Sequence, residues 1–576
     1  MTTSTAAGIH VSDAEAPLLN DDVDGSVDYK GRPATHSKSG GWKSAAFIIG
    51  VEVAERFAYY GISSNLISFL TGPLGQSTAK AAENVNLWSG MASLLPLLGA
   101  FIADSFLGRY RMIIVASGLY ILGLGLLSAS AFFFPFEDSD CQKASNNTAC
   151  SPPQLQVILF FFSLYVVALA QGGHKPCVQA FGADQFDELD PIECKAKSSF
   201  FNWWYFSFCA GVLVALTILN YIQDNLGWGL GFGIPCIVMC LALIIFFLGT
   251  RTYRFRTPSD DRNPFIRIGQ VFVRAVRNWH TKPAAISTEE EAQGVLPHES
   301  IQQFKFLNKA LVMPDGSKKD DRVCSIDDIE EAKAVLRLFP IWATSLVYAI
   351  VFSQMSTLFT KQGVTMDRRI TSSLQIPAAS LQSFITIAIL IVLPIYDRIL
   401  VPVAGAITRK PSGISLLQRI GIGIFFAMLS MVAAAIVEIK RLETAIEHGL
   451  IDTPKATVPM SVWWLIPQYL FFGVADVFTM VGLQEFFYDQ APGELKSVGL
   501  ALYLSIFGIG SFLSGFLISV IEKITSRNGQ TSWFADNLNR AHFDYFYWLL
   551  AGLTAASLIA FIYFSRSYIY NRKLVI

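Results

Sequence analysis

Apolar runs of about 20 residues recur along the whole length of this chain, separated by shorter polar stretches. Each run is long enough to cross a bilayer once, because a spanning α-helix needs about 20 apolar residues. The runs predict about twelve membrane-spanning helices, near residues 45–70, 86–106, 110–134, 155–181, 199–222, 230–250, 335–359, 374–397, 414–438, 461–486, 498–521 and 543–566.

The composition agrees with a membrane location. Hydrophobic residues make up 52% of the 576 residues and charged residues only 15%, whereas soluble proteins carry about 25% charged residues. The net charge of −1 offers no basic surface for nucleic acid. We therefore expect a multi-pass membrane protein that contacts membrane lipid and does not bind nucleic acid.

A long polar stretch divides the expected helices into two groups of six. This layout is that of the major facilitator superfamily fold, an all-α membrane protein with 12 transmembrane helices in two six-helix bundles. The expected domains are a cytosolic disordered tail, an N-terminal six-helix bundle, a cytosolic central linker, a C-terminal six-helix bundle and a second cytosolic tail, at residues 1–43, 44–250, 251–333, 334–566 and 567–576.

Basic residues mark one side of the membrane. An even number of spans places both termini on the same side, and the loops on that side hold Arg109, Arg111, Lys195 and Lys197 in the first half of the chain. The positive-inside rule therefore predicts cytosolic termini and a cytosolic linker.

The loop between the third and fourth spans then faces the outside or a lumen. It begins and ends with Cys141 and Cys150 and contains Asn146 in the glycosylation sequon Asn-Asn-Thr. A disulfide between the two cysteines would need such an oxidising face. Two free loop cysteines are the alternative interpretation.

Three charged residues interrupt the first apolar run: Glu52, Glu55 and Arg56. Each ionisable side chain at the bilayer centre costs roughly 2.5–3.5 kcal/mol on insertion scales, so such residues usually face a functional path. At spacings of three and four residues, all three can share one helix face. Two carboxylates and one guanidinium leave a surplus negative charge that a proton can neutralise, which is the chemistry of a proton-coupled carrier.

A second charged set lies in the loop after the second span, where Asp104 is followed by Arg109. The glycines around them permit close helix approach, and the two charges can pair across a cytosolic gate. A looser echo of this loop, Asp397-Arg398, follows the eighth span, as expected for an internal repeat.

Several motifs resemble one known family. They are Glu52-Val-Ala-Glu55-Arg56, the run from Gly172 to Phe186, the run Phe200-Phe201-Asn202-Trp203-Trp204-Tyr205, and the run from Pro467 to Pro492. Together they resemble the proton-coupled oligopeptide transporter superfamily, and within it the plant nitrate and peptide transporter (NRT1/PTR) family.

The resemblance implies an alternating-access symporter driven by protons, with the proton as coupling ion and no other cofactor. By motif match, Glu52, Glu55, Arg56 and Lys175 form the proton-coupling set. A charged lysine stabilises an ionised carboxylate, and losing that partner favours the protonated form. Substrate binding at Lys175 or Arg56 could thus favour carboxylate protonation. A static ion-pair network that holds two helices together is the alternative.

The residues expected to bind substrate are Arg56, Tyr59, Tyr60, Lys175, Phe352, Gln354 and Asp476. In peptide-carrying members of the family the position of Asp476 holds a glutamate, and some nitrate-carrying members have a histidine at the position of Phe352. The aromatic residues suit a larger organic anion, or are packing or lipid-facing residues. Nitrate, a di- or tripeptide, and an organic anion such as a hormone or specialised metabolite all remain candidates.

Other function classes have less support in the sequence. It contains no nucleophile–base set for an enzyme, no metal-ligand spacing and no Walker loop for an ATP-driven pump. A nutrient sensor or weakly coupled channel-like facilitator on the same scaffold is the alternative to a symporter. The expected membrane is the plasma membrane or the vacuolar membrane, and regulatory kinases acting on cytosolic segments are the remaining expected partners.

Overall fold

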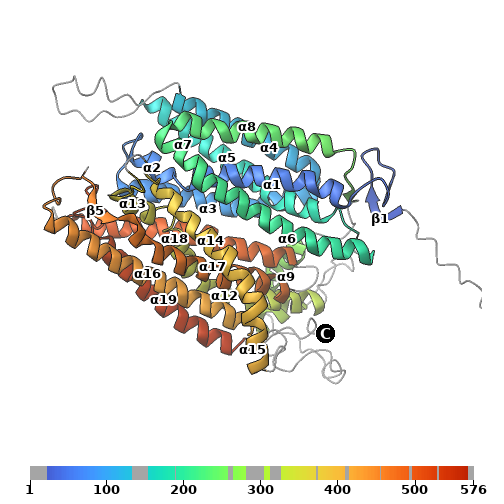
Figure 1. Ribbon diagram of the computed structural model, residues 1–576. Helices are drawn as coiled ribbons and strands as arrows, with labels where there is room; N and C mark the ends of the chain where they lie inside the picture. The colour runs from blue at the N-terminus through green and yellow to red at the C-terminus, as the bar shows by residue number, and fades with distance from the viewer. Residues whose placement is uncertain are drawn as a thin grey trace, which may run out of the picture.

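The computed structural model consists of two helical bundles that lie side by side (Figure 1). It describes residues 22–132, 153–187, 190–256, 264–279, 304–311, 326–371, 374–408, 414–454, 456–491, 496–527 and 531–568. Strand β1, the start of helix α1 and the end of helix α19 lie at one end of the molecule, called here the near end. The opposite end is called the far end.

The N-terminal bundle is formed by the first eight helices. Their bounds are α1 (Gly41–Ser63), α2 (Leu66–Thr71), α3 (Thr78–Ile102), α4 (Arg109–Phe132), α5 (Gln154–Ala183), α6 (Pro191–Val214), α7 (Asn220–Asn225) and α8 (Trp228–Gly249). A π-helical turn, Ala215–Leu219, joins α6 and α7 into one continuous span.

The C-terminal bundle follows the linker. Its helices are α12 (Ile326–Phe352), α13 (Leu358–Val364), α14 (Ser383–Ile395), α15 (Val401–Thr408), α16 (Leu416–Glu447), α17 (Ile466–Gln490), α18 (Lys496–Thr525) and α19 (Phe543–Arg566). Two short parallel strands at the far end, β4 (Met366–Asp367) and β5 (Val458–Ser461), pair between the loops of this bundle.

Twelve helical spans build the two bundles, which confirms the predicted fold class. Among the described residues, eleven helical segments are long and apolar enough to cross a membrane. The twelfth span is α1, which falls outside that set because Glu52, Glu55 and Arg56 lie in its middle. It nevertheless packs within the N-terminal bundle against α5, α6 and α8.

The N-terminal segment differs from the prediction. Disorder was expected through residue 43, and this is wrong for residues 22–43. Strand β1 (Asp22–Val27) pairs antiparallel with β2 (Pro33–Thr35) and with β3 (Phe255–Arg256), which follows α8. The sequence could not reveal the pairing with β3, because that strand lies more than 200 residues away in the chain.

The linker also contains ordered structure that the sequence analysis did not assign. Helix α9 (Pro264–Arg277) and a 3₁₀ helix, η3 (Lys305–Leu311), lie within residues 251–333. Helix α12 begins at Ile326, before the expected start of the C-terminal bundle at residue 334. Its acidic first turns continue into the span without a break.

Glycines allow the helices of the N-terminal bundle to approach closely. A Cβ atom added at Gly99 of α3 would lie 2.1 Å from the carbonyl oxygen of Gly172 in α5. No side chain fits there, because real Cβ atoms do not come so close to a backbone oxygen. This contact places the next residues of α5, His174 and Lys175, at the level of the charged residues of α1.

The two bundles contact each other mainly at the far end. Helix α3 packs against α18, and α6 against α14. Polar contacts join the bundles there: Gln382 Nε2 donates to the carbonyl oxygen of Ser64 at 3.0 Å, and Lys361 Nζ to Thr71 Oγ1 at 3.1 Å. The path between the bundles is therefore closed at the far end.

Candidate functional site

The charged residues of α1 form a compact buried cluster. Arg56 Nε donates to Glu52 Oε1 at 2.6 Å and lies 3.1 Å from Glu55 Oε2. The side chains are 5%, 1% and 0% exposed for Arg56, Glu52 and Glu55. One guanidinium is thus shared by two carboxylates, as the helical spacing predicted.

The two carboxylates are held unequally. Glu52 accepts the short bond from Arg56, whereas Glu55 accepts only a long one, 3.4 Å, from the hydroxyl of Tyr120 on α4. Each carboxylate keeps one oxygen, Oε2, that no hydrogen bond from a described residue reaches. The two differ in their contact with Arg56, which is a 2.6 Å hydrogen bond for Glu52 and a 3.1 Å ion pair for Glu55.

Helix α5 adds two residues to this cluster. Lys175 interacts electrostatically with Glu52, Glu55 and Arg56, although it forms no ion pair with any described residue. His174 is fully buried and packs edge-on against Tyr120, and neither of its ring nitrogens has a hydrogen-bond partner among the described residues. Lys175 thus lies close enough to the charged residues of α1 to interact with them electrostatically, but no direct bond among the described residues joins it to them.

The two tyrosines of α1 have different surroundings. Tyr59 stacks on the buried Trp88 of α3, with ring centroids 5.4 Å apart, so it packs inside the N-terminal bundle. Tyr60 contacts Phe208 of α6, and the Arg56 guanidinium lies 5.0 Å from the centre of that same ring. Tyr60 therefore lies beside Phe208 and Arg56, whereas Tyr59 packs against α3 inside the N-terminal bundle.

Asp476 of α17 faces this surface from the other bundle. Its carboxylate accepts a hydrogen bond from the Tyr348 hydroxyl of α12. It also interacts electrostatically with three further tyrosines, two of which, Tyr60 and Tyr205, lie in the N-terminal bundle, and one, Tyr503, in α18. A carboxylate of one bundle and a guanidinium of the other thus lie on facing sides of the same interface.

Phe352 and Gln354, both expected to bind substrate, are placed apart. Phe352 packs edge-on against Phe507 and Phe472, the aromatic group beside Asp476. Gln354 is buried, and its Nε2 donates to Ser514 Oγ of α18 at 2.9 Å, within the C-terminal bundle. The same hydroxyl accepts from Asn86 of α3 at 3.1 Å, so Gln354 supports the contact between the bundles indirectly, while Phe352 lies beside the candidate substrate site.

Arg109 of the expected gate pair has a partner that the sequence did not predict. Arg109 Nη1 donates to Asp184 Oδ2 at 2.6 Å, at the near end of α5. Asp104 lies in the π-helical turn Ala103–Leu107, and its side chain is outside the described part of the chain. Sequence analysis missed Asp184, although it is part of the run that carried the family resemblance.

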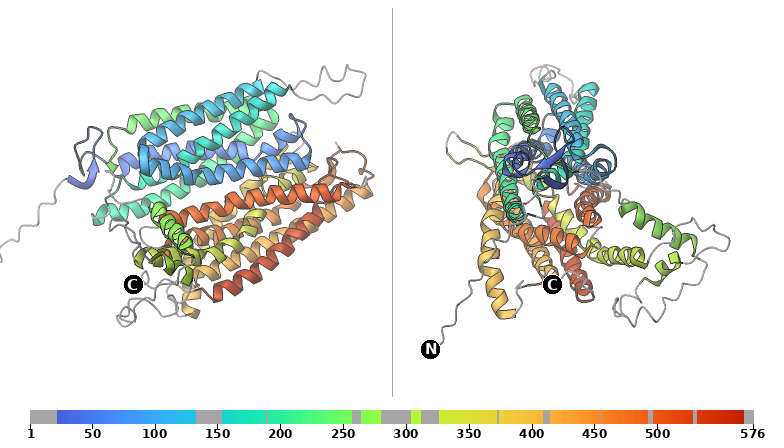
Figure 2. Two further views of the ribbon diagram at one scale, coloured as in Figure 1. Left: turned by 180° about the vertical axis from the view of Figure 1, so that it is seen from behind. Right: turned by 90° about the vertical axis from the view of Figure 1, so that its right-hand side faces the viewer.

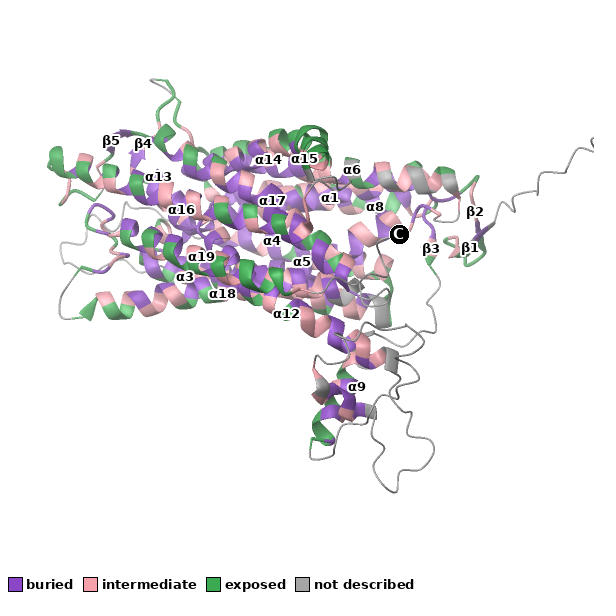
Figure 3. Cartoon of the chain, turned by 90° about the horizontal axis from the view of Figure 1, so that it is seen from below, coloured by how far each residue is buried: buried purple, intermediate pink, exposed green. Residues whose placement is uncertain are grey.

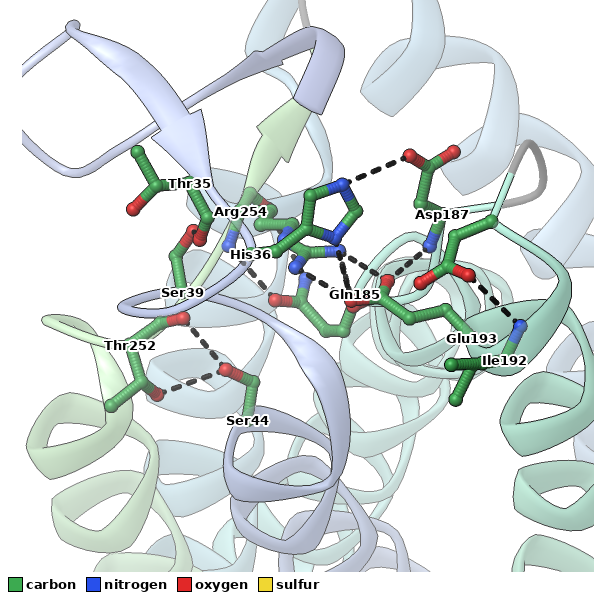
Figure 4. A network of polar contacts seen from close by, with 11 residues as sticks. Thr35, His36, Ser39, Ser44, Gln185, Asp187, Ile192, Glu193, Thr252 and Arg254 are labelled. Carbon is green, nitrogen blue, oxygen red and sulfur yellow. Dashed lines mark hydrogen bonds and ion pairs between the residues drawn. The ribbon is translucent and has the colours of Figure 1, made fainter. Parts of the chain in front are cut away.

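A network at the near end was also missed (Figure 4). Arg254 donates to both carboxylate oxygens of Glu193, at 2.6 and 3.0 Å, and its Nη1 also donates to the carbonyl oxygen of Gln185 at 3.2 Å. His36 Nδ1 lies 3.0 Å from Glu193 Oε1 and ties the N-terminal sheet to α6. Gly40 makes the turn into α1 with φ of 77°, and a Cβ there would lie 2.2 Å from Arg254 Nε.

Glu193 lies outside the spanning part of its helix. Partial burial raises the pKa of Glu193, but hydrogen bonds from Arg254, the Asp187 amide and His36 outweigh it and lower the pKa to about 2. A carboxyl with a lowered pKa contributes stability that is complete above its ordinary value of 4.5 and is lost as the pH falls towards about 2. The contribution of Glu193 to stability is therefore fully present throughout the cellular pH range.

Some expected site residues cannot be placed. Cys141, Cys150 and Asn146 lie outside the described residues.

Three potential metal ligands lie close together in the described part of the chain. His36, Asp190 and Glu193 each offer one ligand atom, and these atoms lie within 4.8 Å of one another. Both oxygens of Glu193 accept hydrogen bonds from Arg254, so the guanidinium already neutralises the carboxylate that a metal cation would bind.

Comparisons with known proteins agree with this architecture. Residues 110–534 match the sequence profile PTR2, that of the POT family. The chain is 64% identical over 562 residues to Protein NRT1/PTR FAMILY 5.10 of Arabidopsis thaliana, covering 98% of each chain. It is 56% identical to Protein NRT1/PTR FAMILY 5.12 of the same plant, covering 96% of this chain and 98% of that one.

Solved structures show the same fold. An auto-inhibited POT family peptide transporter superposes with a TM-score of 0.69 at 23% identity, covering 92% of this chain and 98% of that one. The POT family transporter PepTSo gives 0.67 at 21% identity, with 91% and 98% covered. These proteins are transporters and not enzymes. This multi-pass membrane protein therefore belongs to the POT family of transporters, and among plant proteins to the NRT1/PTR family.

Proposed function

We propose that this chain is a proton-coupled symporter that moves a small anionic solute between its two bundles by alternating access. The observation that carries the proposal is the buried set of Glu52, Glu55 and Arg56, with Lys175 in electrostatic reach. Charged groups at membrane depth are costly and are usually part of a transport path. Closure of the bundles at the far end corresponds to one of the two end states of such a cycle.

The charges suggest how proton and substrate are linked. With Lys175 charged, two carboxylates and two cations balance, so adding a proton to one carboxylate leaves a surplus positive charge. We infer that Glu55 takes this proton, because Glu52 is held by the 2.6 Å bond from Arg56. An anionic substrate group at Arg56 and Lys175 would then restore neutrality, so each ligand favours the binding of the other.

The surroundings favour an organic anion over nitrate. Tyr60, Phe352 and Phe208 offer apolar ring surface close to Arg56 and Asp476, and nitrate has no apolar part to bury against it. A peptide would place its amino terminus at Asp476. That carboxylate already accepts a bond from Tyr348, which reduces its capacity to bind an ammonium group.

Substrate-induced current in voltage-clamped oocytes tests this function. Organic anions, dipeptides and nitrate would be applied at acidic and at neutral pH. An inward current or tracer uptake that increases at acidic pH for organic anions is the expected result. Flux that follows only the gradient of the solute itself would favour the channel-like alternative, and surface expression without any transport would favour a sensor.

Replacing Lys175 by alanine should uncouple transport. Without the lysine, an anionic substrate loses one of its two cationic partners and no longer links to carboxylate protonation. A gradient of one pH unit supplies about 1.4 kcal/mol per proton, which corresponds to about tenfold accumulation of substrate. The Lys175→Ala variant should no longer accumulate substrate by this factor. Tracer uptake with and without a pH gradient measures it. Lys440→Ala, a lysine that lies over the ring of Trp464, is the control and should keep the wild-type ratio.

We further propose that both termini and the linker face the cytosol, at the plasma membrane or the vacuolar membrane, and that regulatory kinases would act on these segments. The distribution of basic residues in the loops supports this orientation. Asn146→Gln tests it: the loss of an enzymatically removable glycan in the variant would agree. A wild-type chain without any glycan, combined with an antibody-accessible N-terminus on intact cells, would overturn it.

A further inference from the structure

One face of helix α9 packs against other parts of the protein. Val271 and Ala275 are buried, and together with Leu307 and Ala310 of the η3 segment they form a small core of their own. Ile329 and Ala332, from the first turns of α12, complete it. This core fixes α9 and η3 to the beginning of α12.

The opposite face of α9 carries exposed apolar side chains. Val273 is 67% exposed and Val276 is 65% exposed. Trp279, just after the helix, is 56% exposed, and Lys309 Nζ lies 5.1 Å from the centre of its ring. Val273 and Val276 are three residues apart and therefore share one side of the helix. Single exposed apolar residues are ordinary. Whether this face binds something therefore depends on its charge and its position as well.

The charge of this region has one sign. Within residues 264–279 and 304–311 the sequence contains the basic residues Arg267, Arg274, Arg277, Lys305 and Lys309, and no acidic residue. Arg274 and Arg277 follow Val273 and Val276 by one position each, so a basic stripe runs along the edge of the apolar one. Such an arrangement is typical of helices that lie on a membrane surface.

Among the described residues, the start of α12, against which α9 packs, carries acidic side chains that could neutralise that charge. Glu330 is engaged on its own helix: its Oε1 lies 2.7 Å from Lys333 Nζ, and its Oε2 lies 3.7 Å from Arg337 Nη2. Asp328 and Glu331 also have interaction partners.

The position of α9 matches the level of a membrane surface. Seen along the bundles, α9 stands outside the ring of spanning helices (Figure 2), and it projects sideways near the near end of the C-terminal bundle (Figure 3). The turns of α12 against which it packs include the start of a candidate membrane span at Asp328. A helix that projects sideways at this level meets lipid headgroups.

We propose that the exposed face of α9 binds anionic lipid headgroups of the leaflet at the near end. Val273, Val276 and Trp279 enter the interface, and Arg274 and Arg277 pair with lipid phosphates. Given the orientation proposed above, this is the cytosolic leaflet, where anionic lipids are concentrated. The contact tethers the linker between the bundles, so lipid composition would influence how the two bundles move.

The test uses the full-length chain in nanodiscs of phosphatidylcholine, with or without phosphatidylserine. Hydrogen exchange of residues 264–279 should slow only in discs that contain phosphatidylserine, and added salt should reverse the effect. Because both leaflets of a nanodisc have the same composition, the result does not depend on the orientation or the function proposed above.

A matched pair of double variants makes the test specific. Replacing Arg274 and Arg277 by Gln should weaken phosphatidylserine binding, titrated by native mass spectrometry, by roughly 30-fold, since each basic residue near an anionic surface contributes about fivefold. Replacing Lys30 and Lys38, two exposed lysines of the N-terminal segment, by Gln removes the same charge and should change binding less than about twofold.

Several outcomes would overturn the proposal. One is equal phosphatidylserine binding by the arginine variant and the wild-type chain. Another is exchange of residues 264–279 that is the same in both kinds of disc. Exchange that slows with protein concentration and not with phosphatidylserine would assign the face to a second copy of the chain. The arginine side chains are outside the small core, and an unchanged thermal transition of the variant would verify folding.

Discussion

Replacing Glu55 by glutamine is expected to abolish accumulation driven by a proton gradient while leaving exchange of substrate across the membrane intact. Glutamine keeps the size of the side chain and can still accept from Tyr120, but it cannot take up a proton. The variant should therefore lose the tenfold accumulation that each pH unit provides per proton, about 1.4 kcal/mol. Proteoliposomes with an imposed pH gradient measure accumulation, and counterflow in the absence of a gradient measures exchange.

The matched control for this experiment is Glu83→Gln. Glu83 is a carboxylate at the far end of α3 that pairs with Lys80 on the surface, at 3.1 Å. The same chemical change there should leave accumulation within about twofold of the wild type, because an exposed ion pair is worth at most about 1 kcal/mol. If the Glu55 variant still accumulates substrate along a pH gradient, while the Glu52→Gln variant does not, the proton belongs to Glu52. Full accumulation by both variants would remove the cluster from the coupling mechanism.

Replacing Arg441 by leucine should destabilise the protein by about 3–5 kcal/mol, because it leaves a buried carboxylate uncompensated. Arg441 and Glu438 of α16 are 1% and 0% exposed, and Arg441 Nη2 donates to Glu438 Oε1 at 2.6 Å. Arg441 also holds Asn539 and the carbonyl oxygen of Leu538, in the loop before α19. Thermal unfolding of the purified protein in detergent should show a lower midpoint.

Two further variants distinguish lost charge balance from lost packing. Replacing both Glu438 by leucine and Arg441 by methionine should restore much of the stability, because a buried ion pair can be exchanged for apolar side chains at little cost. Arg369→Leu breaks an exposed pair with Asp367, 2.8 Å long, and should cost at most about 1 kcal/mol. A wild-type midpoint for Arg441→Leu would contradict the expected role of this pair.

Much of the fold could be predicted from patterns of residues that lie close together in the chain. Membrane spans follow from runs of apolar residues, and the shared face of Glu52, Glu55 and Arg56 follows from the helical period. Both depend on neighbours in the chain, so they could be predicted without the fold. The pair of Glu438 and Arg441 obeys the same logic, since opposite charges three residues apart in an apolar run indicate a buried pair. The span predicted from the sequence ends at residue 438, so Arg441 falls outside it and the pair is not predicted.

Partners distant in the chain could not be predicted from local patterns. Asp184, 75 positions from Arg109, is a partner that the sequence did not predict. The pairing of Arg109 with the nearby Asp104 stays a prediction, because the Asp104 side chain lies outside the described part of the chain. The segment from residue 22 to 43 looked disordered because it has few apolar residues of its own. It is ordered through backbone pairing with β3 and through the contacts of His36 with Glu193.

The sequence by itself thus determined the twelve spans, their division into two bundles and the identity of the charged residues in α1, because each is written in the spacing of residues close together in the chain. Only the tertiary structure decided that Glu55 is held less tightly than Glu52, that Asp476 faces Tyr60 from the other bundle, and that α9 stands beside the bundle with its apolar face exposed. These depend on how helices distant in sequence pack, and packing distances of a few ångströms decide which charges share a partner.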